Sequence, residues 1–264
     1  MSDVVGATTV GADPWQVLRS ATRARVALGR AGDGLPTARW LEFRAAHATA
    51  RDAVHTPVDP ALLRAGLGDR ELLEVHSAAP DRATYLQRPD LGRRLAPGTD
   101  LPAGDVDLAV VLSDGLSPRA LHEHAAGTVS ALLERLPGWT VGPLVLASQA
   151  RVALGDEVGA ALGARAVVVL IGERPGLSSA DSLGIYLTWA PRQGRADSER
   201  NCVSNVRPPH GLGYAQAADT VVALLDAARA LGASGVALKD EGPVLLPGPA
   251  QPGTARSGAA QPGM

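Results

Sequence analysis

Short apolar runs of the kind that form buried strands recur through residues 104–241 and alternate with segments of helical spacing. The runs lie at 107–113, 144–147, 166–171 and 182–189, and a further short strand is predicted at 236–238. The helices predicted between and after them lie at 118–136, 150–163 and 214–231. Because near-continuous apolar strands are buried on both faces, this alternation predicts a mostly parallel, Rossmann-like α/β domain.

Residues 13–103 show helical rather than strand spacing and are predicted to form a helical N-terminal region. Its helices are expected at 13–29, 36–56, 60–67 and 69–77, followed by an irregular connection over 78–103. The first helix opens on Asp13-Pro14, an N-cap residue followed by proline at the first helical position. Residues 1–12 are predicted to be a flexible N-terminus. Residues 242–264, rich in proline, glycine and alanine, are predicted to be a disordered tail.

The composition excludes several broad functional classes. With 25 lysine and arginine residues against 27 aspartate and glutamate residues, the formal net charge is −2, which argues against a polybasic nucleic-acid binder. No apolar run approaches the about 20 residues that a membrane-spanning helix needs, so no membrane association is expected. The chain has 1 cysteine and therefore no internal disulfide, which favours a reducing, cytoplasmic compartment.

The loops that follow the predicted strands are where a ligand site is expected, because parallel sheets bind ligands beyond the carboxyl ends of their strands. Glu173 directly follows the strongest apolar run, and the Pro175-Gly176 turn after it is expected to hold its side chain at that edge. A solvated turn residue explains the same pattern equally well. Asp114 and Ser117 follow the first run, where they either cap the next helix or line the ligand edge.

The only thiol, Cys202, lies in the polar segment 201–205, which we expect on the loop side of a strand. A lone cysteine can act as a nucleophile when a basic neighbour lowers its pKa. No histidine or lysine lies near it in the sequence, and free cysteines are more often small apolar fillers. A packing role is therefore the preferred interpretation of Cys202.

The segment 122–127 (HEHAAG) offers two metal interpretations. His122 and His124 are two positions apart on a predicted helix and do not face each other, so they do not share one metal ion easily. The Asp-x-His-x-x-Gly motif, whose histidine binds cobalt in one class of cobalamin proteins, is broken because His122 stands where aspartate is required. We therefore expect surface helix histidines here and predict no metal site.

Several blocks of residues along the chain resemble one protein family, in the same order. They are Asp13–Trp15, Ala27–Arg30, Leu35–Thr37, Ala46–His55, Ser113–Ser117, Arg151–Asp156, Gly172–Leu177 and Asn201–Asn205. Over roughly residues 13–240 the chain is similar to the small (light) subunit family of ethanolamine ammonia-lyase.

The resemblance implies a subunit of an adenosylcobalamin enzyme that converts ethanolamine to acetaldehyde and ammonia by a radical mechanism. The radical chemistry would reside in a large (heavy) barrel subunit, against which the small subunit clamps the cobalamin within a higher hetero-oligomer. The cofactor-binding residues that the resemblance implies are Val152, Glu173 and Cys202, none of them catalytic. In the family the cofactor keeps its own benzimidazole on cobalt, so no cobalt-binding histidine is needed.

Two functions of other classes remain open at this point. One is a stand-alone binding or scaffolding protein, and the other is a hydrolase that uses Cys202 as its nucleophile. A gene for a large barrel partner beside this one would favour the lyase subunit. The resemblance also leaves open entry into a bacterial microcompartment, for which residues 1–12 offer no clear amphipathic helix.

Overall fold

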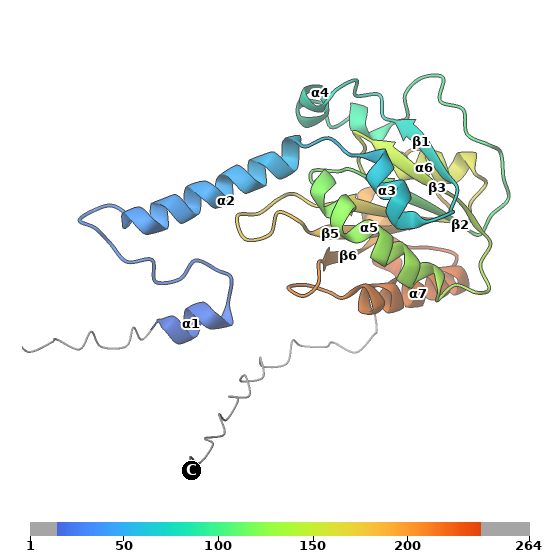
Figure 1. Cartoon of the computed structure of the whole chain (residues 1–264). Coiled ribbons are helices and arrows are strands. Elements are labelled where there is room, and N and C mark those ends of the chain that lie inside the picture. Colours follow the sequence, from blue (N-terminus) through green and yellow to red (C-terminus); the bar gives the residue numbers. More distant parts are fainter. Residues whose placement is uncertain (1–14, 239–264) are drawn as a thin grey trace, which may run out of the picture. The chain divides into compact units, whose positions relative to one another are not determined.

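The computed structural model of the chain describes residues 15–238 (Figure 1). Of these, residues 15–36 belong to one compact unit and residues 37–238 to another. The expectations of a flexible stretch at 1–12, a helix start at Asp13-Pro14 and a disordered tail at 242–264 lie outside the described residues.

Within residues 15–36 the first unit contains one helix, α1 Gln16–Ala21, so the prediction of a helix reaching residue 29 was wrong. The helix ends at Thr22, whose backbone is extended and whose Oγ1 accepts a hydrogen bond from the backbone N–H of Ala24 at 3.1 Å. A threonine side chain that binds the backbone in this way competes with helical hydrogen bonding. The following residues include Gly29 with a φ of 77°, which no continuing helix could contain.

The second unit is built on a six-stranded sheet with the order β1-β3-β2-β4-β5-β6. The strands are β1 Leu72–His76, β2 Leu108–Ser113, β3 Val141–Ser148, β4 Ala166–Gly172, β5 Leu183–Trp189 and β6 Arg200–Val206. Strands β1 to β4 pair in parallel, whereas β5 runs antiparallel to both β4 and β6. The prediction of a helical N-terminal region followed by a mostly parallel α/β domain is confirmed.

Helices cover both faces of the sheet (Figure 1). The helices α3 Pro60–Leu67, α5 Pro118–Leu133 and α7 Tyr214–Leu231 pack on one face, and α6 Leu154–Ala161 packs on the other. The unit also contains α2 Thr37–His55 and α4 Arg82–Gln87, which belong to neither core cluster. Along β2, Leu108, Val110 and Leu112 pack with α3, α5 and α7, while Ala109 and Val111 pack with α6. Successive strand side chains point to opposite faces, which is why a continuous apolar run fits a strand buried on both sides. Within residues 15–238, no helix is both long and apolar enough to span a bilayer.

The sheet differs from the predicted one at its edges. The stretch 69–77, predicted to be helical, forms the edge strand β1, and the strand β6 was not predicted at all. Residues 236–238, predicted to be a strand, belong instead to the short 3-10 helix Gly235–Ala237 and its C-cap. The connection 78–103 was expected to be irregular, yet it contains α4 and a 3-10 turn at Leu91–Arg93.

Candidate functional site

The loops after β2 and β3 lead to helices on opposite faces, so they diverge at the carboxyl edge of the sheet. Open α/β sheets bind ligands at such a point. Hydrogen bonds fix the loops there: Asp114 after β2 accepts from the backbone N–H groups of Gln149 and Ala150 after β3, at 2.9 and 3.0 Å. The N–H of Leu116 in turn donates to the carbonyl of Gly172 at the end of β4, at 2.9 Å.

The two interpretations of Asp114 and Ser117 can now be separated. Ser117 caps α5 by accepting from the N–H of Ala120 at 3.2 Å, and its hydroxyl donates to the carbonyl of Ala180 at 2.7 Å. Asp114 is 1% exposed, and burial raises the pKa of its carboxyl, while the N–H groups that it accepts from act in the opposite direction. Both side chains therefore support the fold of the loops rather than face a ligand.

A cavity of about 690 Å³ opens over this edge of the sheet. Its lining comes from the loops after β2, β3 and β4, from strands β5 and β6, and from the segment around α4. It contains Val152, Glu173 and Cys202, so the structure brings together the three site residues named from the sequence. The other lining residues are Tyr85, Arg93, Gly115, Leu116, Arg151, Ile171, Gly172, Arg174, Tyr186, Asp197, Arg200 and Ser204.

Glu173 is held at the cavity by hydroxyl groups. Its Oε2 accepts from Ser182 Oγ at 2.5 Å and from the backbone N–H of Asn205 at 3.4 Å, and its Oε1 accepts from Ser204 Oγ at 2.5 Å. The Pro175-Gly176 turn, which was expected to hold the Glu173 side chain, instead closes on Ser179 farther along the loop. A carboxylate has about four lone-pair positions, so Glu173 retains acceptor capacity toward the cavity.

Cys202 was expected in a loop, but it lies in the edge strand β6, directly opposite Tyr186 of β5. Along β6, Arg200, Val203 and Val206 are buried, whereas Cys202 is exposed and lines the cavity. Partial burial raises the pKa of the Cys202 thiol, and the nearby Glu173 carboxylate adds to this effect. A raised pKa disfavours the thiolate that nucleophilic chemistry requires.

Tyr85 and Arg151 line the cavity and were not named as site residues from the sequence, and Arg82 packs on the same tyrosine ring. The guanidinium groups of Arg82 and Arg151 lie over the Tyr85 ring, at 4.8 and 4.5 Å from its centroid. The Tyr85 hydroxyl donates to the carbonyl of Ala150 at 3.2 Å, and burial raises the pKa of this phenol to about 12. Arg82 lies three residues before Tyr85 on α4, but Arg151 and Ala150 belong to the loop after β3, so the sequence around Tyr85 does not reveal their contacts with it.

A buried ion pair lies beside the cavity. Arg200 donates to both carboxylate oxygens of Asp156, at 2.6 and 2.7 Å, and these side chains are only 3% and 2% exposed. The guanidinium also donates to Thr188 Oγ1 at 2.8 Å and to the carbonyl of Arg195 at 3.1 Å. This pair joins α6 to the edge strand β6 and so fixes the strand that carries Cys202.

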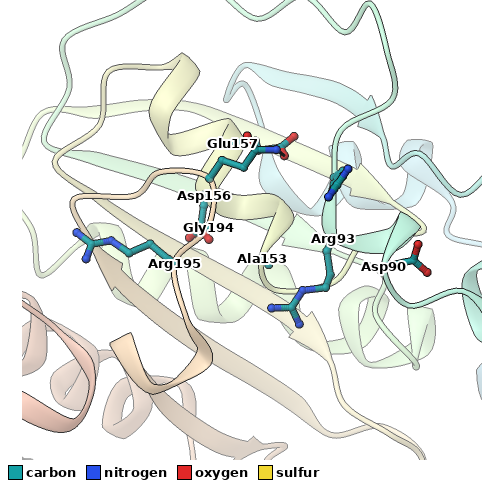
Figure 2. Close-up of a pocket in the computed structure, with 9 residues that line it drawn as sticks. Asp90, Arg93, Ala153, Asp156, Glu157, Gly194 and Arg195 are labelled. Atoms are coloured by element: carbon teal, nitrogen blue, oxygen red, sulfur yellow. Dashed lines mark hydrogen bonds between the residues drawn. The ribbon is translucent and has the colours of Figure 1, made fainter.

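A second pocket, of about 580 Å³, is lined by Asp156 of that pair and by neighbouring charged residues (Figure 2). Figure 2 shows Asp156 and Glu157 of α6 between Arg195 and Arg93. Glu157 accepts from the N–H of Leu95 at 2.8 Å, and Arg195 is paired with Glu199. These charges are engaged by neighbouring groups, so we regard the first cavity as the better candidate for a ligand.

Comparison with known proteins assigns the family. The family model described as ethanolamine ammonia-lyase light chain (EutC) matches residues 12–239. The chain is 55% identical over 251 residues to the ethanolamine ammonia-lyase small subunit of Ralstonia nicotianae, which covers 90% of this chain and 92% of the relative. It is 56% identical over 256 residues to the protein of the same name from Azotobacter vinelandii, covering 92% and 93% respectively.

The chain belongs to the ethanolamine ammonia-lyase light-chain family. The resemblance noted in the sequence is thus confirmed, and the relatives are subunits of an ammonia-lyase. A further light-chain relative, from Rhodococcus erythropolis, is 53% identical over 232 residues and covers 86% of this chain and 90% of its own length. The matched range, residues 12–239, includes all the residues that line the cavity.

Proposed function

We propose that this chain is the small subunit of an adenosylcobalamin-dependent lyase that converts ethanolamine to acetaldehyde and ammonia, and that the cavity at the carboxyl edge of the sheet contacts the cobalamin. The observation that carries this proposal is that the three expected cofactor-binding residues line the same cavity. Val152, Glu173 and Cys202 lie on separate elements, and the fold places all of them on the lining of one cavity. The location agrees with the general rule for ligand sites in open α/β sheets.

The residues of the cavity fit such a ligand chemically. Cobalamin presents amide side chains around an extended ring, so a matching surface needs both acceptors and donors beside apolar patches. Glu173 supplies acceptor oxygens, and Arg151 supplies a guanidinium whose Nε is buried without a hydrogen-bond partner among the described residues. Val152 and Ile171 supply apolar surface, and the exposed Cys202 supplies a small side chain that a ring can approach closely.

In this proposal the chain binds and orients the cobalamin and takes no part in the reaction itself. Adenosylcobalamin, held by the residues that line the cavity, would supply the radical chemistry of the reaction. Glu173 and Arg151 fix the position of the amide groups, and the apolar lining excludes water from the ring. The substrate and the radical steps belong to the large subunit.

A partner is also needed to explain the exposed apolar side chains of α2. Trp40 and Leu41 are 47% and 59% exposed on this helix. Aromatic residues on a surface are typical of protein interfaces. In the proposal this face belongs to the contact with the large subunit in a hetero-oligomer. Whether that assembly is enclosed in a bacterial microcompartment stays a prediction of the family resemblance.

The purified chain alone should release no ammonia from ethanolamine in the presence of adenosylcobalamin, because its cavity offers binding groups and no activated nucleophile. Mixing it with the large subunit should restore turnover, measured as ammonia release, and the large subunit alone serves as the control. Turnover by the small chain alone would contradict the proposal. Failure of the two chains to co-purify would contradict it independently of activity.

Replacing Cys202 by serine should leave most of the turnover of the complex intact. Serine has nearly the same size, and the raised pKa of the thiol indicates that sulfur performs no chemistry. The measurement is turnover at saturating cofactor, together with the apparent dissociation constant for cobalamin. Complete loss of turnover with unchanged cofactor affinity would favour the alternative of a cysteine-dependent hydrolase. Cofactor binding without any turnover in the complex would favour a binding or scaffolding protein.

A further inference from the structure

The second histidine of the segment 122–127 is buried, contrary to the expectation of surface histidines. His124 is 5% exposed, and its Nε2 is buried without a hydrogen-bond partner among the described residues. His122, by contrast, accepts from the backbone N–H of Asp59 through its Nε2 at 2.8 Å. An unsatisfied buried nitrogen costs free energy, so the surroundings of His124 call for a physical explanation.

The other ring nitrogen of His124 is held by Tyr214. The Tyr214 hydroxyl lies 3.0 Å from His124 Nδ1 and can donate onward to the carbonyl of Glu123 at 3.5 Å. In the site proposed below, Nδ1 carries the proton and donates to the phenol oxygen, which leaves the lone pair on Nε2. The Tyr214 ring is fixed because it packs on Gly127, where an added Cβ would come within 2.5 Å of it.

Two carboxylates complete the surroundings of this lone pair. One oxygen each from Glu123 and Asp181 and a ring nitrogen of His124 all lie within 4.8 Å of one another, and Glu123 Oε2 is 3.9 Å from His124 Nε2. Arg119 binds Glu123 through Oε1, and Arg207 binds Asp181 through Oδ1. Each arginine therefore orients its carboxylate and leaves the second oxygen, Glu123 Oε2 or Asp181 Oδ2, without a hydrogen bond.

We propose that Glu123, His124 and Asp181 form a binding site for a divalent metal ion of the zinc type. A neutral imidazole with two carboxylates suits Zn²⁺ or Co²⁺, whereas Mg²⁺ and Ca²⁺ prefer sites made of oxygen alone. Because Glu123 is exposed, the ion can enter from solvent.

The hydrogen bond from His124 Nδ1 to Tyr214 is typical of metal-binding histidines, whose second nitrogen usually donates to a fixed partner. The site is separate from the proposed cofactor cavity, since none of its residues lines that cavity. It also differs from the metal site rejected in the sequence analysis, which required His122 and His124 to share an ion. The structure instead pairs His124 with its neighbour Glu123 and with Asp181 of the loop after β4.

The test is metal titration of the full chain, prepared without a histidine tag and stripped with a chelator. Co²⁺ should bind to one site per chain, as measured by calorimetry and by the visible absorption of the bound ion. Added Zn²⁺ should displace the Co²⁺. Replacing His124 by glutamine should raise the dissociation constant at least about tenfold, because loss of a partner that merely orients a ligand already costs roughly 10–100-fold. Tyr214→Phe, which removes only that orienting bond, should weaken binding to a similar or smaller extent.

Matched variants separate this site from chance binding. Glu123→Gln and Asp181→Asn should each weaken Co²⁺ binding, whereas His210→Gln, at an exposed histidine outside the cluster, should not. Glu123 is on the surface, so its variant keeps the test valid even if His124→Gln fails to fold. Absence of Co²⁺ and Zn²⁺ binding by the native chain, or equal affinity in native chain and Glu123→Gln, overturns the proposal.

Discussion

Replacing Glu173 by alanine is expected to weaken the binding of adenosylcobalamin by the assembled complex roughly ten- to a hundredfold. A hydrogen bond to a charged acceptor contributes about 1.5–3 kcal/mol, and a tenfold change in affinity corresponds to about 1.4 kcal/mol. The carboxylate is already oriented by Ser182 and Ser204, so little ordering remains to be done when a ligand amide binds. The rate at saturating cofactor should change much less than the apparent dissociation constant.

Two further variants isolate this effect. Glu173→Gln should lose less affinity than Glu173→Ala, because the amide still offers an acceptor oxygen and the serine hydroxyls can rotate. Glu134→Ala is a matched control: Glu134 also accepts from a serine, Ser130, at 3.1 Å, but lies away from the cavity. An unchanged dissociation constant in Glu173→Ala would show that Glu173 only links β4 to β6.

Replacing Asp156 by alanine is expected to lower the free energy of unfolding by about 3–5 kcal/mol, the usual cost of leaving one charge of a buried pair alone. The Arg200 guanidinium would keep its bonds to Thr188 and to the carbonyl of Arg195 but lose its bidentate carboxylate. The measurement is urea-induced unfolding of the full chain at constant pH.

The matched control for this prediction is Asp219→Ala. Asp219 pairs with Arg135 at 2.5 Å, but its side chain is 67% exposed, and exposed pairs contribute at most about 1 kcal/mol. The difference between the two variants therefore reports burial rather than charge. Equal destabilisation in both would mean that the Asp156–Arg200 pair is not isolated from water as the structure shows.

The centre of the sheet could be predicted from the sequence because its strands are buried on both faces. The runs at 107–113 and 166–171 became β2 and β4, which lie side by side in the middle of the sheet. The edge strands carry a weaker signal. In β6 only Arg200, Val203 and Val206 are buried, so the sequence shows no apolar run, and its assignment as a loop was wrong.

The site could be predicted only in part. The strand-end rule and the family resemblance both led to Glu173, whereas Val152 and Cys202 were implied as site residues by the resemblance alone. The structure places all three on one cavity. What holds these side chains could not be predicted, because the partners come from distant segments. Ser204 of β6 donates a hydrogen bond to Glu173, which follows β4. Arg200 of β6 binds Asp156 of the helix α6. Such pairings depend on strand register, which the sequence alone did not determine.

A structure of the assembled complex with adenosylcobalamin bound tests the central claim most directly. The account predicts that the cofactor lies between the subunits, against the cavity, with Val152, Glu173 and Cys202 in contact with it. A cofactor held by the large subunit alone, with this cavity facing solvent or filled by protein, would contradict the account.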